Sequence, residues 1–254
     1  MELWTREHAL LLIPAFVIEL ILSILIAKWL KNRSDKIKLI PILTIGIILF
    51  VLEILKQIFW GFRTSQYDLY CLPFHFCSLF IFIYILTYFI RGKYQENMRI
   101  FSTVCGGVLF LMMLVYPALI FTNYDILHFS QIFISFHTVI FHLLSVFAFM
   151  LIICMNLYTL NIKRDLLTLT TGIGIFSIVS AIMANILKTN FASFYFSQMT
   201  IFEGVRLSII ASLGVFGQIV YDIIVFLSIL MASIGSYFLI FGIRKLVDKR
   251  YINK

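Results

Sequence analysis

Charged side chains are scarce in this sequence. Only 13% of its 254 residues are Asp, Glu, Lys or Arg, whereas about 25% is usual in a soluble domain. Hydrophobic residues make up 62% of the chain, and the mean hydropathy is +1.03. This composition excludes an ordinary soluble domain and predicts an integral membrane protein.

Several signatures of binding and catalysis are also missing. The chain contains no phosphate-binding loop, dinucleotide fingerprint or nucleophile elbow, and its 4 cysteines show no disulfide framework or metal-ligand spacing. We therefore expect no metal and no cofactor. The net charge of +8 is one feature of nucleic-acid binders, but here the basic residues lie in short clusters between apolar runs, as in membrane proteins. We expect membrane lipids as partners, and no nucleic acid.

Seven apolar runs are long enough to cross about 30 Å of hydrocarbon as helices. They extend over Ala9–Leu30, Leu39–Phe62, Cys71–Ile90, Ile100–Phe121, Ser130–Tyr158, Leu166–Leu187 and Ser212–Ile243. The first run is long enough to span, so we expect no cleavable signal peptide. Residues 188–211 are expected to be an amphipathic loop or a re-entrant piece, with an eighth crossing as the less favoured alternative. We predict an all-α bundle of seven transmembrane helices that forms one domain over residues 1–254.

The basic residues predict the orientation of this bundle. Alternate connections and the C-terminal tail contain fifteen of the 20 Lys and Arg residues: Lys28, Lys31, Arg33, Lys36, Lys38, Arg91, Lys93, Arg99, Lys163, Arg164, Arg244, Lys245, Lys249, Arg250 and Lys254. The opposite side has only Arg6, Arg63, Lys188 and Arg206. Because basic connections stay in the cytoplasm, the N-terminus is expected outside and the C-terminus inside.

The candidate functional residues centre on Cys71-Leu-Pro-Phe-His-Phe-Cys-Ser78 at the start of the third run. Polar groups inside a bilayer are costly, which makes them functional-site candidates, and this orientation places them in the outer halves of the spans. The candidate catalytic residues are His75, His137, Ser78 and Cys77, and the candidate substrate-binding residues are Glu53, Lys56, Gln57, Asn190 and Asp222. We expect these residues to frame an outward-facing polar cavity. The alternative is that each only forms hydrogen bonds between helices.

Helical spacing ranks the possible nucleophiles. On one regular helix, Cys71, His75 and Ser78 share a face, whereas Cys77 points about 160° away from His75. This spacing favours Ser78 or Cys71 over Cys77 as the partner of His75. Elsewhere, Glu53 and Lys56 are three residues apart and are expected to neutralise each other.

Three motifs resemble those of YwaF-like bacterial integral membrane proteins. They are Leu72-Pro-Phe-His-Phe-Cys-Ser78, Phe133-Ile-Ser-Phe-His137 and Lys188-Thr-Asn-Phe191. This family is distantly similar to eukaryotic multispan lipid acyltransferases, in which a Cys beside a His is implicated. The His matches His75 here, but the position that matches the Cys is Phe74, so that nucleophile is not carried over. The resemblance implies a multi-pass protein of the cell membrane, and of the bacterial plasma membrane in particular.

Two classes of function follow from these observations. The first is a lipid acyltransferase or lipid hydrolase, in which a histidine acts as general base toward a hydroxyl or thiol and the substrates are outer-leaflet lipids. The alternative is a non-enzymatic transporter, channel, or lipid- or small-molecule-binding protein, in which the buried ionisable groups line a pathway.

Overall fold

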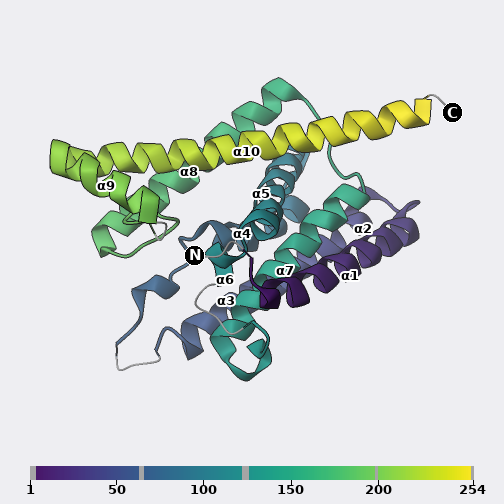
Figure 1. Cartoon of the computed structure of the whole chain (residues 1–254). Coiled ribbons are helices and arrows are strands. Elements are labelled where there is room, and N and C mark those ends of the chain that lie inside the picture. Colours follow the sequence, from purple (N-terminus) through teal and green to yellow (C-terminus); the bar gives the residue numbers. More distant parts are fainter. Residues whose placement is uncertain (1–3, 63–65, 122–125, 198–199, 253–254) are drawn as a thin grey trace.

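The computed structural model describes residues 4–62, 66–121, 126–197 and 200–252, which form helices joined by turns, without strands in these ranges (Figure 1). The α-helices are α1 (Arg6–Leu30), α2 (Asp35–Lys38), α3 (Ile40–Phe59), α4 (Leu79–Phe89), α5 (Gln95–Val115), α6 (Ala118–Phe121), α7 (Phe133–Cys154), α8 (Ile162–Leu187), α9 (Thr200–Leu213) and α10 (Val215–Ile252). Single 3-10 turns lie at η1 (Leu69–Cys71), η2 (Phe76–Ser78), η3 (Gly92–Tyr94) and η4 (Phe129–Gln131). The all-α prediction is confirmed.

The number of membrane-spanning helices differs from the expected seven. In the described ranges, 6 helices are long and apolar enough to cross a membrane, and they include α1, α3, α5, α7, α8 and α10. The third expected span is instead a shorter apolar helix over Phe76–Phe89 that follows an irregular segment. The prediction of one regular helix from Cys71 is wrong, because Pro73 holds the residue before it in extended backbone. Leu72 accordingly has φ −59° and ψ 144°, and His75 is also extended at φ −77° and ψ 154°.

The chain after α8 also differs from the simplest expectation. The segment expected as a loop or re-entrant piece ends in a separate helix, α9, which packs along the start of α10 (Figure 1). The two helices meet at Gly214, which has φ +57° and closes α9 in the left-handed conformation that suits glycine. At Gly217 an added Cβ would lie 2.6 Å from Ile210 Cα, so the close approach of the two helices requires the missing side chain.

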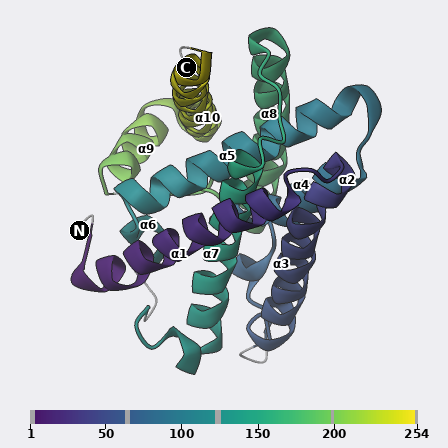
Figure 2. The same ribbon diagram turned by 90° about the vertical axis from the view of Figure 1, so that its right-hand side faces the viewer.

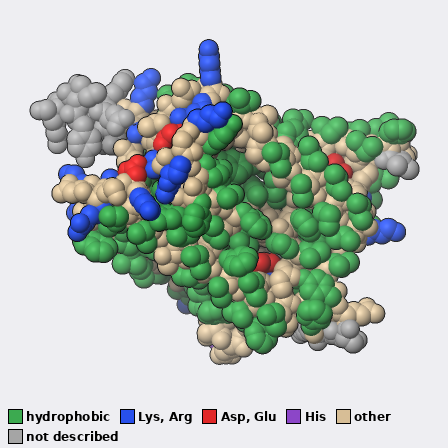
Figure 3. Space-filling view, turned by 180° about the vertical axis from the view of Figure 1, so that it is seen from behind, with side chains coloured by type: hydrophobic (Ala, Val, Ile, Leu, Met, Phe, Trp, Pro, Cys, Tyr) green, Lys and Arg blue, Asp and Glu red, His purple; other side chains and the backbone are tan. Residues whose placement is uncertain are grey.

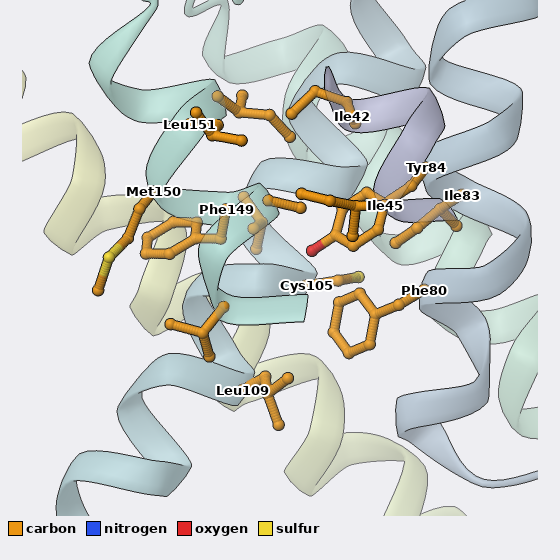
Figure 4. Packing of buried hydrophobic residues seen from close by; sticks show 14 of the residues in the cluster. Ile42, Ile45, Phe80, Ile83, Tyr84, Cys105, Leu109, Phe149, Met150 and Leu151 are labelled. Carbon is orange, nitrogen blue, oxygen red and sulfur yellow. The ribbon is translucent and has the colours of Figure 1, made fainter. Parts of the chain in front are cut away.

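The packed core lies where α3, α4, α5 and α7 meet (Figure 4). Helix α7 packs against α1, α3 and α5 and runs through the middle of the bundle (Figure 2). Tyr84 of α4 is fully buried there, and its hydroxyl donates to the Ser145 carbonyl of α7 at 2.7 Å. This hydrogen bond satisfies a phenol that would otherwise be costly to bury. The short α4 is therefore fixed firmly to the bundle.

Apolar side chains cover much of the outer surface, and basic side chains gather toward one end of it (Figure 3). Three basic connections meet at this end through Arg99 and Glu96: Arg99 Nη1 lies 3.0 Å from Asp35 Oδ2 and 3.1 Å from Glu96 Oε1. Glu96 also accepts a hydrogen bond from the Thr159 backbone at 2.8 Å. Arg244 of α10 donates to the Tyr158 carbonyl, in the same connection as Thr159, at 2.7 Å. The apolar exterior and the helix lengths identify a multi-pass membrane protein.

Candidate functional site

A cavity of about 460 Å³ lies at the end of the bundle opposite the basic connections, and we call it the polar cavity for the ionisable groups set in its mostly apolar walls. Its walls come from the ends of α3, α5, α7 and α10, from residues 70–78, and from the connection between α8 and α9. The ionisable, thiol and hydroxyl groups that line it include Glu53, Lys56, His75, Cys77, Ser78 and His137. The volume is within the range of small-molecule sites. Buried polar groups surrounded by apolar helices make this cavity the candidate site.

The irregular segment before α4 places several of these groups. Gln57 Nε2 donates to the Cys71 carbonyl at 2.6 Å and so ties this segment to α3. On the other side, Ser180 of α8 donates to the Phe74 carbonyl at 2.9 Å. With both anchors in place, Cys71, His75, Cys77 and Ser78 all line the cavity. The regular-helix argument that set Cys77 apart from His75 therefore does not apply to this backbone.

Glu53 is the centre of a network on α3. Its Oε1 lies 2.8 Å from Lys56 Nζ and accepts from Gln57 Nε2 at 2.6 Å. The Glu53 and Lys56 side chains are 8% and 11% exposed, so their charges compensate each other away from bulk solvent. The other oxygen of Glu53, Oε2, lies 3.8 Å from His137 Nε2 of α7. The predicted ion pair is present, and it lies beside a candidate catalytic histidine.

Three histidines line the cavity, and for two of them the hydrogen-bond partner indicates which nitrogen carries the proton. His75 Nε2 lies 3.0 Å from the Tyr70 carbonyl, and His142 Nδ1 lies 2.7 Å from the Thr138 carbonyl. A carbonyl only accepts, so each of these nitrogens is a donor, and the other ring nitrogen is left as an acceptor when the ring is neutral. His137 Nε2 is buried without a hydrogen-bond partner among the described residues. Hydrogen bonds in these ranges therefore do not fix the tautomer of His137, and a neutral ring with its proton on Nδ1 has Nε2 as an acceptor.

The other predicted residues have distinct positions. Asn190 is 5% exposed and lines the cavity, with its Oδ1 3.5 Å from the backbone nitrogen of Phe196. Gln57 supports the cavity from outside its lining, through Glu53. Asp222 also lies outside the lining and accepts from Asn185 Nδ2 of α8 at 2.9 Å. The predicted role of Asp222 in substrate binding stays a prediction.

Sequence reasoning missed part of the lining. Tyr70 and Ser193 both line the cavity, and the Tyr70 ring lies 4.5 Å from the His75 ring between centroids. Tyr221 lines it as well, and its hydroxyl donates to the Ser193 carbonyl at 2.9 Å. Ser193 has φ +69°, a left-handed backbone that no periodic pattern predicts. The one available signal was the polar character of the connection around Asn190.

No cluster of three or more His, Cys, Asp or Glu residues suited to a metal ion occurs in the described ranges. The side chains at the cavity offer an imidazole at His137, thiol and hydroxyl groups at residues 71–78, and a compensated ion pair.

Comparison with known proteins identifies the family of the chain. No curated protein and no solved structure matches the chain. The model of the TMEM164 family, a multispan membrane family, matches residues 3–234 and so covers nearly all the helices and the whole cavity lining. The chain belongs to the TMEM164 family.

Proposed function

We propose that this protein is a membrane enzyme that removes an acyl group from a membrane phospholipid and passes it to water or to a lysolipid. The observation that carries the proposal is the cavity itself. His137, whose Nε2 is buried and has no hydrogen-bond partner within the described part of the chain, lines the same space as the thiol and hydroxyl groups of residues 71–78. That space lies between apolar helices, which favour an acyl ester and exclude bulk water.

Cys77 is the best-placed nucleophile for this chemistry. Cys71 and Ser78 are each only 2% exposed, whereas Cys77 is half-buried and so more accessible to a substrate in the cavity. A thiol is also intrinsically a stronger nucleophile than the hydroxyl of Ser78. This choice reverses the ranking that regular helical spacing gave. The extended backbone at His75 removes the basis of that ranking.

The reaction has two halves that balance. Cys77 Sγ attacks the ester carbonyl carbon as its proton passes to a histidine, and the carbon–oxygen bond to glycerol breaks. The departing alkoxide takes the proton back from the histidine, which leaves a thioester on Cys77 and a free lysolipid. Water or the hydroxyl of another lysolipid then gives its proton to the histidine and attacks the thioester. The thiolate leaves and is reprotonated, so the enzyme returns to its starting state.

Neighbouring groups assist these steps. Glu53, 3.8 Å from His137 Nε2, stabilises the imidazolium that forms when His137 accepts the proton. Asn190 retains its amide nitrogen as a donor for the oxyanion, because its oxygen faces a backbone nitrogen. An outer-leaflet position of the cavity is supported by the positive-inside rule, because the basic connections lie at the opposite end of the bundle.

The acyl-enzyme is the testable intermediate. The full chain in nanodiscs is incubated with a phosphatidylcholine whose sn-2 chain ends in an alkyne, and the protein is then conjugated to a fluorophore. We expect covalent labelling that neutral hydroxylamine removes, since it cleaves thioesters faster than oxygen esters. Labelling is expected to vanish in Cys77→Ala and to persist in Cys154→Ala, whose cysteine does not line the cavity.

Two other outcomes have clear meanings. Hydroxylamine-resistant labelling that disappears in Ser78→Ala would move the nucleophile to Ser78. If no variant is labelled and no lysolipid is released by correctly folded protein, the enzyme proposal fails. The buried ionisable groups would then favour a transport or binding role.

A further inference from the structure

A second cavity of about 670 Å³ lies on the outside of the bundle between α4, α5 and α8. Its walls are mostly apolar, and several of them face outward: Phe82 of α4 is 50% exposed, and Leu167 and Ile175 of α8 are 69% and 61% exposed. We refer to this cavity as the α4–α8 groove. In a membrane-spanning bundle, such a groove opens to lipid chains rather than to water.

Local packing shapes the floor and one end of the groove. Phe101 of α5 forms part of the floor beside Gly172 of α8, where an added Cβ would lie 2.5 Å from the Phe101 ring. The missing side chain at Gly172 therefore gives the ring its place. Asn97 Nδ2 donates to Thr168 Oγ1 at 2.6 Å and joins α5 to α8 at the end toward the basic connections.

The other end of the groove adjoins the polar cavity. His75 lines both spaces, with Pro73 and Phe74 on the groove side and Phe76 and Cys77 on the cavity side. The irregular chain before α4 lies at this boundary, and the buried Phe191 ring contacts both Phe74 and His75 there at 5.3 Å between centroids. The groove thus ends at a histidine that also lines the cavity of the candidate nucleophile.

The length of the groove is closer to the thickness of one lipid leaflet than to that of the whole hydrocarbon core. Its lining on α8 runs from Leu167 to Ser180, which is about 20 Å at the helical rise per residue. One leaflet contributes about half of the 30 Å hydrocarbon core. An extended acyl chain fits this length, whereas a complete bilayer-spanning segment of another protein does not.

We infer that the α4–α8 groove holds one acyl chain of a membrane phospholipid, with its ester at the His75 end and its methyl end near Tyr94 and Leu167. This inference rests on the proposed acyl chemistry for its direction, since the ester must reach the polar cavity. The walls of the groove are mostly apolar, as an acyl chain requires. The polar groups that would recognise a head group lie beyond His75.

Photocrosslinking tests the inference without requiring catalysis. The full chain in nanodiscs is loaded with phosphatidylcholine that carries a diazirine either near the sn-2 ester or at the end of that chain, and the labelled peptides are mapped by mass spectrometry. We expect the near-ester probe to label the region of Phe74 and Ser180. The chain-end probe is expected to label the region of Tyr94 and Leu167. Labels spread equally over these sites and the lipid-facing side of α1, with either probe, would overturn the inference.

A matched pair of variants separates the groove from the general lipid surface. Ile175 lines the groove and Ile178 does not, yet the two side chains are 61% and 62% exposed on the same helix. Ile175→Trp is expected to reduce labelling of α4 and α5 by about tenfold, because it fills an apolar site. Ile178→Trp is expected to leave labelling unchanged. If Ile175→Trp does not fold, Val179→Phe fills the same groove one turn further along.

The same preparations distinguish failure of the groove from failure of the proposed function. Depth-ordered labelling that persists in Cys77→Ala, without any acyl-enzyme in wild type, supports the groove and rejects the enzyme. Acyl-enzyme that forms at the wild-type rate in folded Ile175→Trp rejects the groove and supports the enzyme.

Discussion

Glu53 lies between a lysine and a histidine, with its Oε1 2.8 Å from Lys56 Nζ and its Oε2 3.8 Å from His137 Nε2. The shorter contact compensates the carboxylate, and the longer one brings its negative charge close to the ring without a hydrogen bond. One residue therefore has two separable tasks: to neutralise Lys56 in the folded bundle, and to stabilise a positive charge on His137 during a reaction.

The first task predicts how α3 responds to substitution. Glu53→Gln and Lys56→Met each leave one buried charge without its partner, and breaking such a pair costs about 3–5 kcal/mol. We expect both single variants to lower the yield of monodisperse protein and its Tm in detergent. The double variant is expected to recover most of both, because it removes the two charges together.

The control for these single and double variants is a more exposed ion pair. Glu203→Gln combined with Arg206→Met disrupts an ion pair that is 25% and 16% exposed, so its effect is expected to be smaller. Equal yields for the two single α3 variants and their double would show that the buried pair contributes nothing to folding.

The basic connections predict the topology of the chain in the membrane. A green fluorescent protein fused to the C-terminus is expected to fluoresce in a Gram-negative bacterial host, and an alkaline phosphatase at the same place is expected to be inactive. Phosphatase fusions that end within residues 66–68, between α3 and η1, should be active. An active C-terminal phosphatase would show the opposite orientation, with the polar cavity on the cytoplasmic side.

Sequence patterns predicted the long helices well because apolar runs in a membrane have few alternatives to helix. They failed at the third span, where Pro73 and the extended backbone at His75 replace the first helical turns. A hydropathy pattern records how apolar a residue is and does not record its backbone conformation, so it extended the helix back to Cys71.

The sequence predicted the depth of the candidate site residues in the membrane better than the side of each helix on which they lie. His75 and His137 were expected at similar depth, and both line one cavity. Asp222 was expected at that depth too, but it pairs with Asn185 instead. Which side of a helix faces a cavity depends on how helices pack, and a single sequence contains little of that information.

The α9–α10 hairpin predicts a pH dependence. Glu203 Oε1 accepts from Arg206 Nη2 at 2.6 Å, and this hydrogen bond is the main reason that the pKa of Glu203 lies below its ordinary value of 4.5. A carboxyl with a lower pKa in the folded state stabilises folding above its unfolded pKa, and that contribution disappears as the pH falls through the folded pKa. We expect Glu203→Gln to lower Tm slightly at neutral pH, by about one or two degrees.

The difference between wild type and Glu203→Gln is expected to shrink as the pH falls from about 4.5 through the lower pKa of folded Glu203, because both proteins have an uncharged group at this position once Glu203 is protonated. Thermal melts in detergent over this range measure it, with Glu7→Gln in α1 as the control for general effects of removing a carboxylate. A difference that stays constant down to the lowest pH would mean that the Glu203 charge has no role in docking α9.

The last prediction concerns the proton acceptor. His137 Nε2 is buried in the cavity without a hydrogen-bond partner in the described ranges, whereas the acceptor nitrogen of His75 lies on a ring already fixed by the Tyr70 carbonyl. If His137 is the general base, His137→Ala should slow formation of the acyl-enzyme by about 10²–10⁴-fold. The rate of fluorophore labelling with the alkyne-tagged phosphatidylcholine measures this effect, and the diazirine probe shows independently whether the lipid still binds. His128→Ala, in the connection before α7 and outside the cavity lining, is the matched control.

A large loss in His75→Ala with a normal rate in His137→Ala would transfer the role to His75, whose Nδ1 is then the acceptor. Normal rates in both variants would leave His142, the third histidine of the cavity lining, as the next residue to replace, and normal rates in all three would reject a histidine base.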